Sequence, residues 1–420
     1  MSSIDNVKRA LRHRNYRLYT AGNSVSLIGT WLQRVAVGWL AWRLTHSGTW
    51  LGLIAVADLV PTLLASPIAG AWADRADRVK VLRVTQIIAM AQAAILALLT
   101  STGRIDIETL FILTLVLGIA NAVNQPARLA LVPNLVERRD IGAAVAINAL
   151  VFHGARFVGP AIAGAVIAWS GASLAFLLNA LSYLGFIVAL GWIRVAAEAP
   201  VARRHLLRES LEGYAYVLRH PGIRPIFLLF AATSLALRGF IELFPGFADQ
   251  VFGRGAQGLA WLVATVGLGA VCGGLWMVGR SSIRGLTSLI INNSLLLCLA
   301  GLGFAATGIY WLALPCVFLC GFAMVVTGIA AQTLIQNAVA PAMRGRVLGL
   351  YGMIFRAGPA LNALILGMLS SEIGLRPPVA AGAAICLFAW GGARLNQAAI
   401  ARALESDAQE MPAASDIPSA

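Results

Sequence analysis

Seven ionisable side chains stand inside long apolar stretches of this chain, where a charge is costly. They are two acids and five arginines: Asp58, Glu242, Arg34, Arg128, Arg156, Arg238 and Arg356. A charged side chain at the centre of a bilayer costs about 2.5–3.5 kcal/mol on insertion scales, so such groups usually face a partner or a water-filled cavity. A carboxyl group in that setting can exchange a proton, and a nearby arginine favours its charged form. These residue types therefore favour proton exchange inside a membrane.

Arg34 and Asp58 are expected at the same depth. They lie ten and nine residues from the near ends of two successive apolar stretches, which is about 15 Å along a helix. The two could exchange a proton or form a static ion pair that braces two helices. Arg238 and Glu242 are spaced i, i+4, which predicts a second pair on one helix face, with the same two interpretations. His153 is a further proton-coupling candidate, although a lone buried histidine more often packs against its neighbours.

Polar side chains in the apolar stretches could contact a substrate or hold helices together. The substrate-contact candidates are Gln33, Asn121, Asn124, Arg156, Gln332, Gln336 and Arg356. No nucleophile with a nearby base, no His/Cys metal cluster and no Gly-rich Lys loop for ATP accompanies them. The five cysteines lie in apolar stretches, as small buried hydrophobes do. We therefore expect no enzyme activity, metal or cofactor, and a proton gradient as the energy source.

The elements that carry these residues have the composition of a membrane protein. Of 420 residues, 59% are hydrophobic and 12% are charged, and the mean hydropathy is +0.79. About 20 apolar residues span a bilayer. Twelve stretches satisfy this: 17–44, 49–73, 81–101, 108–131, 142–168, 173–193, 224–251, 256–279, 286–306, 309–335, 347–370 and 378–398. The predicted fold class is an all-α membrane protein with twelve transmembrane helices.

Basic residues set the expected orientation. Of the 32 Lys and Arg, 23 fall on the side of the membrane that carries both termini, four fall on the other side and five lie inside the stretches. Positive charge accumulates in cytoplasmic loops, so both termini should be cytosolic in a plasma (inner) membrane protein. The net charge of +14 is explained in this way, and no basic soluble domain remains to bind nucleic acid.

The chain divides into two similar halves. We expect a six-helix bundle at 1–193, a cytosolic linker with a surface helix at 194–223, a second six-helix bundle at 224–398 and a partly disordered cytosolic tail at 399–420. Arg34 and Arg238 are 204 residues apart, as are Gly70 and Gly274. A six-helix unit used twice is a transporter architecture, with the binding site between the halves.

The stretch GAWADRADRVK, residues 70–80, resembles the loop signature G-x-x-x-D-R-x-G-R-R/K of the major facilitator superfamily. Gly70, Asp74, Arg75 and Arg78 match it, and Asp77 replaces a glycine. Within that superfamily the chain is most similar to the branch that contains the enterobactin exporter and the macrolide efflux proteins, through residues 29–47, 65–75, 124–136, 148–164 and 343–359. The resemblance implies a transporter. It also implies that Asp74 faces the N-terminus of the eleventh helix, so that the four matching residues latch the outward-open state.

The stretch ARFVGPAIAG, residues 155–164, resembles the motif G-x-x-x-G-P-x-x-G-G of antiporting exporters. Its key positions are Ala155, Gly159, Pro160 and Gly164, and alanine stands where a glycine is usual at Ala155 and at Ala163. Small residues four apart allow close helix approach, and a proline removes a backbone hydrogen bond. The resemblance implies export, and the alternative is tight packing without directional meaning.

These features together predict a secondary active transporter that works by alternating access. The interpretation is proton-coupled efflux of a small amphipathic compound, either a drug or a siderophore, by a protein that functions as a monomer in the lipid bilayer. Two alternatives stay open: an importer of the same fold, and a membrane receptor or scaffold that does not transport.

Overall fold

A computed structural model of the protein describes residues 3–73, 77–193, 214–280 and 282–405, apart from the side chains at 3–6, 63–73, 153, 341, 342 and 356. Every regular element in these ranges is a helix. In chain order they are α1 (Ser3–Arg12), α2 (Arg14–Thr45), α3 (Gly48–Ala73), α4 (Arg78–Ser101), α5 (Ile107–Leu131), η1 (Val132–Leu135), η2 (Arg138–Asp140), α6 (Ile141–Ser170), α7 (Ala172–Trp192), α9 (Ile223–Ala236), η3 (Arg238–Leu243), α10 (Phe244–Gly246), η4 (Phe247–Val251), α11 (Gly255–Val278), α12 (Leu286–Ala306), α13 (Tyr310–Ala338), α14 (Pro341–Ile373), α15 (Arg376–Leu395) and α16 (Gln397–Glu405).

Within the described ranges, ten helical segments are long and apolar enough to cross a membrane. They coincide with the third to the twelfth predicted stretches. The helices α2 and α3 coincide with the first two, but α2 contains four arginines, and α3 is described with its side chains only as far as Thr62. The protein is therefore a multi-pass helical membrane protein.

One predicted stretch differs in form. Residues 224–251 are not a single α-helix, because α9 ends at Ala236 and is followed by the 3₁₀ turn η3, the short α10 and the π-helical turn η4. Leu237 leaves helical geometry because its φ is −131°, although its ψ of −43° is a helical value. The linker and the tail are described only in part. Residues 214–219 of the linker and the start of the tail, as α16, are helical, whereas 194–213 and 406–420 lie outside the described residues.

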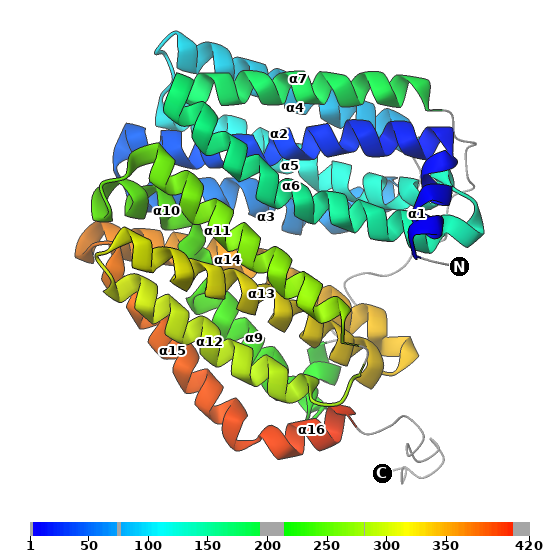
Figure 1. The fold of residues 1–420 in the computed structure, drawn as a ribbon, viewed down its shortest axis with the longest axis vertical. Coiled ribbons are helices and arrows are strands. Elements are labelled where there is room, and N and C mark those ends of the chain that lie inside the picture. Colours follow the sequence, from blue (N-terminus) through cyan, green and yellow to red (C-terminus); the bar gives the residue numbers. More distant parts are fainter. Residues whose placement is uncertain (1–2, 74–76, 194–213, 281, 406–420) are drawn as a thin grey trace.

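The helices form two groups, drawn blue to green and green to orange in Figure 1. In the first bundle, α2–α7, α2 packs against α6 and α7, and α5 packs against α3 and α4. In the second bundle, α9–α15, α14 packs against α9 and η3, and α13 packs against α11 and α12. The most extensive contacts between the described parts of the two bundles are those of α3 with α14 and of α6 with α11.

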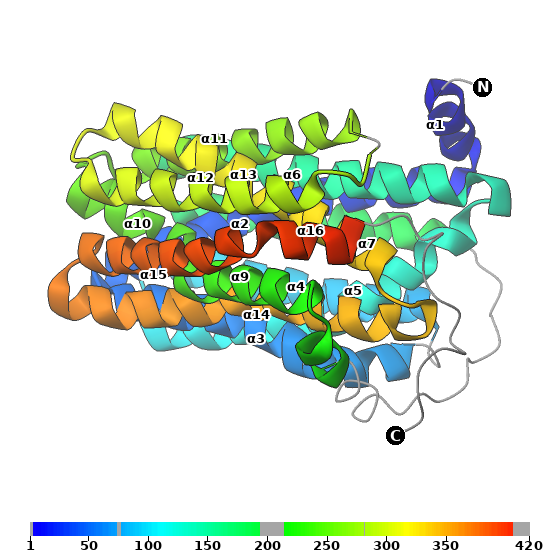
Figure 2. The same cartoon turned by 90° about the horizontal axis from the view of Figure 1, so that it is seen from below.

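The bundles meet at one end and diverge toward the other. Both α1 and α16 lie at the diverging end, which we call the terminal end, and the opposite end, with the α2–α3 and α14–α15 connections, we call the far end (Figures 1 and 2). At the far end α3 and α14 approach backbone to backbone. A methyl group added to Gly367 would overlap the carbonyl of Gly48, so glycine is required for this approach.

A polar contact reinforces the far end. Trp42, near the end of α2, donates its indole N–H to Asp249 Oδ2 of η4 at 2.9 Å, and this bond joins the two bundles. The rings of Trp42 and His46 meet edge to face, 5.5 Å apart. The indole is 2% exposed, so the hydrogen bond satisfies its one polar atom within the contact.

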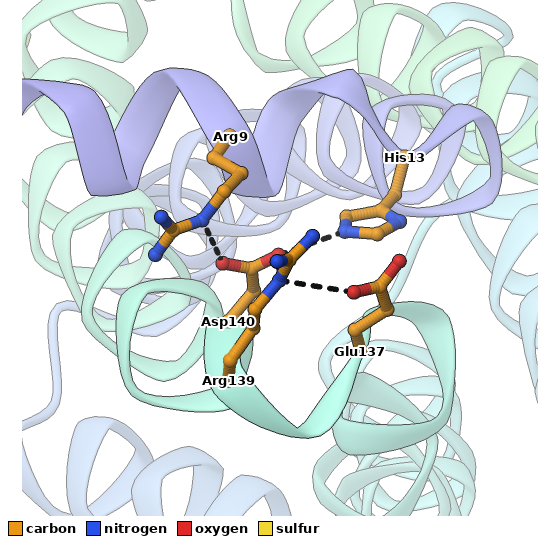
Figure 3. Close-up of polar contacts among 5 residues, drawn as sticks. All are labelled: Arg9, His13, Glu137, Arg139 and Asp140. Carbon is orange, nitrogen blue, oxygen red and sulfur yellow. Dashed lines mark hydrogen bonds and ion pairs between the residues drawn. The ribbon is translucent and has the colours of Figure 1, made fainter.

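At the terminal end, an acidic side chain attaches each outlying helix to its bundle. Asp140 of η2 is fully buried and accepts hydrogen bonds from Arg9 of α1 and from His13, which precedes α2 (Figure 3). The hydrogen bond from His13, followed by that from Arg9, lowers the pKa of Asp140 below its usual value. Glu405 of α16 accepts the backbone N–H groups of Gly285 and Thr287 at 2.6 and 2.7 Å, at the start of α12.

Candidate functional site

Arg34 binds both of the carboxylates that the sequence places inside apolar stretches. Its Nη1 lies 3.3 Å from Asp58 Oδ2 of α3, and its Nη2 lies 2.8 Å from Glu242 Oε1 of η3. The three side chains are 30%, 19% and 27% exposed, so water reaches each of them. The Arg34–Asp58 pair agrees with the prediction from equal depth. Since Glu242 belongs to the second bundle, the same arginine also links the two bundles.

The position of Glu242 depends on the break in the seventh stretch. After α9 ends, the backbone N–H of Gly239 donates to the side chain of Asn362 on α14 at 2.7 Å, which fixes η3 against that helix. A 3₁₀ run within a membrane segment often marks a functional hinge. Here the turn, which contacts α3, carries Glu242 to Arg34 of α2.

The pair predicted between Arg238 and Glu242 is not formed. Both residues lie in η3, where three residues make a turn, so a spacing of four no longer places them on one face. Arg238 is 5% exposed, and its Nη2 donates to the Met324 carbonyl at 3.1 Å. Its guanidinium lies 4.8 Å from the ring centre of Phe230 and 5.5 Å from that of Phe355, a cation–π arrangement.

Arg156 of α6 lies close to Arg34. Both guanidinium groups approach the ring of Trp31, at 5.3 Å for Arg34 and 5.4 Å for Arg156. The spacing of Trp31 and Arg34, i and i+3 on one helix, placed them on one face and could have indicated this contact. Trp31 thus holds two arginines beside the carboxylates, in the middle of α2 rather than at the membrane interface, where tryptophan is enriched.

The small-residue motif of α6 serves close packing. Ala155 is buried, and a methyl group added to Gly159 would lie 2.6 Å from Trp31 Cβ. Farther along, Gly164 packs against Ala260 of α11 in the other bundle, and Pro160 lies within the helix. The motif therefore brings α6 against both α2 and α11, which is the packing that the spacing predicts.

The polar candidates fall into two groups. Gln33 is 1% exposed, donates to Gln92 of α4 and accepts from Asn179 of α7, at 2.9 and 2.8 Å. Asn124 is 3% exposed and donates to Thr85 of α4 at 2.7 Å. In this conformation both side chains form hydrogen bonds that join helices of the first bundle. The remaining candidates with described side chains are half-buried or exposed: Asn121, Gln332 and Gln336.

Several predicted residues fall outside what the structure describes. Asp74 and Arg75 of the latch lie outside the described residues, and of Gly70 only the place in α3 is described. The side chains of His153 and Arg356 likewise lie outside the description. Arg78 begins α4, and its Nη1 donates to the Ala130 carbonyl at 3.4 Å. Asp77, which departs from the loop signature, caps α4 by accepting the N–H groups of Val79 and Lys80.

The comparison of sequences decides the family. A family described as transmembrane secretion effector, of major facilitator type, matches residues 9–416. The chain belongs to this family. Among its curated relatives in the major facilitator superfamily are a staphyloferrin A transporter of Staphylococcus aureus, 27% identical over 86% of this chain and 90% of that protein, and an enterobactin exporter of Escherichia coli, 28% identical over 89% and 88%.

Solved structures show the same fold. A bacterial homologue of the human lysosomal transporter spinster, in an inward-facing and unoccupied conformation, matches with a TM-score of 0.71 and 16% identity over 94% of this chain and 99% of that one. A POT family transporter in complex with 5-aminolevulinic acid matches at 0.73 and 12% identity, over 92% and 96%. A bacterial homologue of the iron transporter ferroportin matches at 0.67 and 15% identity, over 92% and 98%.

Family membership establishes the broad activity. The protein is a membrane transporter of the major facilitator superfamily that carries a small-molecule substrate. It is not an enzyme, and transporters of this superfamily work from ion gradients without a cofactor. With its apolar helices and its bacterial relatives, the chain is a multi-pass inner-membrane protein.

Proposed function

We propose that the protein is a proton-coupled efflux transporter that moves a small amphipathic compound, a drug or a siderophore, by alternating access. The observation that carries this proposal is the position of Arg34, which is shared between Asp58 of its own bundle and Glu242 of the other. A protonated carboxyl group no longer attracts an arginine as an ion. Protonation of Glu242 would therefore weaken the link between the bundles, whereas protonation of Asp58 would weaken a link within the first bundle.

The proposed topology has twelve spans with both termini in the cytosol. The helices α2 and α3 supply the first two spans beside the ten apolar segments. Corresponding helices pack alike in the two bundles, as α3 on α5 and α11 on α13, which supports two six-helix repeats. The basic residues gather at the terminal end, and the positive-inside rule then favours a cytosolic location for that end.

With this orientation, the structure corresponds to a state that faces the cytosol. The far end is closed by α3 against α14 and by Trp42 against Asp249, and the bundles diverge at the terminal end. Export requires the reverse arrangement, in which the far-end contacts open and the terminal end closes. The predicted latch of Gly70, Asp74, Arg75 and Arg78 would stabilise that second state.

The coupling step follows from the charges. In the state described here Arg34 is bound by two carboxylates, so the link between the bundles is complete when both acids are ionised. In the second state the site opens to the outside, where a proton can reach Glu242. Return to the cytosol-facing state and release of that proton restore the link. Antiport requires that the proton and the substrate be carried in opposite halves of this cycle.

The relatives bear on direction and substrate. One is named a staphyloferrin A transporter and another an enterobactin exporter, which supports the efflux of a siderophore at the level of analogy. An importer of the same fold remains the alternative, because the α6 motif is explained by packing. A static brace at Arg34 is the second alternative, in which the carboxylates never exchange protons.

The experiment is a flux screen in inverted membrane vesicles with dyes, macrolides and siderophores. Export predicts accumulation of at least one compound when the vesicle interior is acidic, and loss of that accumulation when a protonophore removes the gradient. Import would be driven by the opposite gradient, and a non-transporting receptor would give no flux under either condition.

A further inference from the structure

Arg156 carries a positive charge that forms no ion pair with an acid among the described residues. It is half-buried on α6, and among the described residues its guanidinium contacts the ring of Trp31 and makes neither an ion pair nor a hydrogen bond. Both carboxylates nearby are engaged by Arg34. A guanidinium group has five N–H donors, and those of Arg156 are not among the buried nitrogens that lack a partner, so they reach solvent.

The nearby ion pairs leave Arg156 without a carboxylate of its own. Arg34 engages both Asp58 and Glu242, and Arg156 meets Arg34 only at the ring of Trp31, which both guanidinium groups approach. A guanidinium group without an ion pair at this depth is unfavourable.

The remaining charge has a defined geometry. Trp31 holds the Arg156 guanidinium 5.4 Å from its ring centre and is itself packed edge to face on Phe152. This support orients the planar fork of guanidinium N–H groups. The fork matches the two oxygens of a carboxylate and binds them with two parallel hydrogen bonds. A cationic substrate would meet like charge at Arg156, and a neutral one would leave the Arg156 guanidinium without an ionic partner.

We propose that Arg156 is the subsite for a carboxylate group of the substrate, so that the transporter selects small organic anions. Trp31 is the positioning residue that orients the fork. The identity of the physiological anion rests on the proposed transport function, but occupation of the subsite does not. An inside-negative membrane potential also favours the outward movement of an anion, in agreement with efflux.

The test compares salicylate with salicylamide, which replaces the carboxylate by a neutral amide on the same ring. Both are titrated against the purified full-length protein in detergent, without any gradient, and binding is followed by ligand-observed NMR. Salicylate should bind at least about tenfold more tightly than salicylamide. Arg156→Gln should remove this preference, and Arg156→Lys, which keeps the charge and loses the fork, should retain part of it.

Arg254→Gln is the matched control, because Arg254 also lies over aromatic rings, those of Tyr310 and Trp311, but at the far end. It should leave the preference for salicylate unchanged. Equal binding of the two probes, no binding of salicylate at millimolar concentration, or an undiminished preference in Arg156→Gln would overturn the subsite. Binding through Arg156 without any proton-driven flux would instead retain the subsite and reject the proposed function.

Discussion

Arg34 and Glu242 form an ion pair of 2.8 Å across the boundary between the two bundles. The second partner of Arg34, Asp58 at 3.3 Å, lies within the same bundle as the arginine. Protonation of Asp58 and protonation of Glu242, which the sequence alone does not distinguish, therefore have different consequences. The ion pair with Glu242 links the bundles at this level, and the ion pair with Asp58 holds Arg34 within the first bundle.

Glu242→Gln should uncouple transport from the proton gradient. The amide cannot exchange a proton, so gradient-driven accumulation should fall at least about tenfold, while exchange of substrate down its own gradient continues. Both rates can be measured in proteoliposomes with a compound from the flux screen. Glu108→Gln, at an exposed acid of the first turn of α5, is the control and should behave as the parent.

Gly367→Ala should open the far end. The added methyl group overlaps the Gly48 carbonyl, and neither backbone can yield without separating α3 from α14. The change is measured with Ser370→Cys, a buried neighbour, and a membrane-impermeant maleimide applied from outside. Labelling should rise by about tenfold, the effect of a 1.4 kcal/mol shift in population. Gly185→Ala meets no atom within 4 Å and should leave labelling unchanged.

Gln33→Leu should lower stability rather than alter selectivity. Its amide joins Gln92 and Asn179 in the interior of the first bundle, and its loss leaves the side-chain oxygen of Gln92 and the side-chain N–H group of Asn179 without this partner. The expected cost is about 1–3 kcal/mol in the free energy of unfolding, measured by denaturation in detergent. Gln332→Leu, at an exposed position, should change stability by less than about 0.5 kcal/mol. A changed substrate preference with unchanged stability would show that Gln33 contacts the substrate.

The attachment of α1 should depend on pH through Asp140. Its hydrogen bonds with His13 and Arg9 lower its pKa from the usual 3.8, so the ionised form stabilises the attachment above about pH 4, and this contribution is lost as pH falls further through the lowered pKa. A spin label at Val7→Cys should become mobile below pH 4 in the parent. In Asp140→Asn it should be mobile already at pH 7.

The control for Asp140 is Glu137→Gln. Glu137 is 58% exposed and pairs with Arg139 rather than with α1. In Glu137→Gln, the spin label at Val7→Cys should show the same pH dependence as in the parent. Equal mobility of the label in the parent and in Asp140→Asn at pH 7 would contradict a role of Asp140 in holding α1.

The sequence predicts the membrane helices well because their signal is composition over about 20 residues, which tertiary contacts do not alter. The same logic predicts the Arg34–Asp58 pair, since depth in a membrane follows from residue number along a straight helix. It fails at Arg238, where the chain leaves α-helical geometry after Ala236. Gly239 and the nearby Pro245 are tolerated in membrane helices, so they do not by themselves predict the break, and η3 is stabilised by a bond from Gly239 to the distant Asn362.

Contacts between the bundles likewise cannot be predicted from the sequence. The bond from Trp42 to Asp249 joins residues that are 207 positions apart, and neither position is unusual for a residue near the end of a span. The link from Arg34 to Glu242 has the same character, at a separation of 208. Such pairs depend on which ends of the bundles meet, which changes during the transport cycle and is not a property of any single helix.

The most direct test of the coupling role of Glu242 is accumulation in inverted vesicles with an acidic interior, compared between the parent and Glu242→Gln for the same compound. The parent should concentrate the compound inside and lose it when a protonophore is added, whereas Glu242→Gln should only equilibrate it. Accumulation by Glu242→Gln equal to that of the parent, with the same sensitivity to the protonophore, would contradict the account.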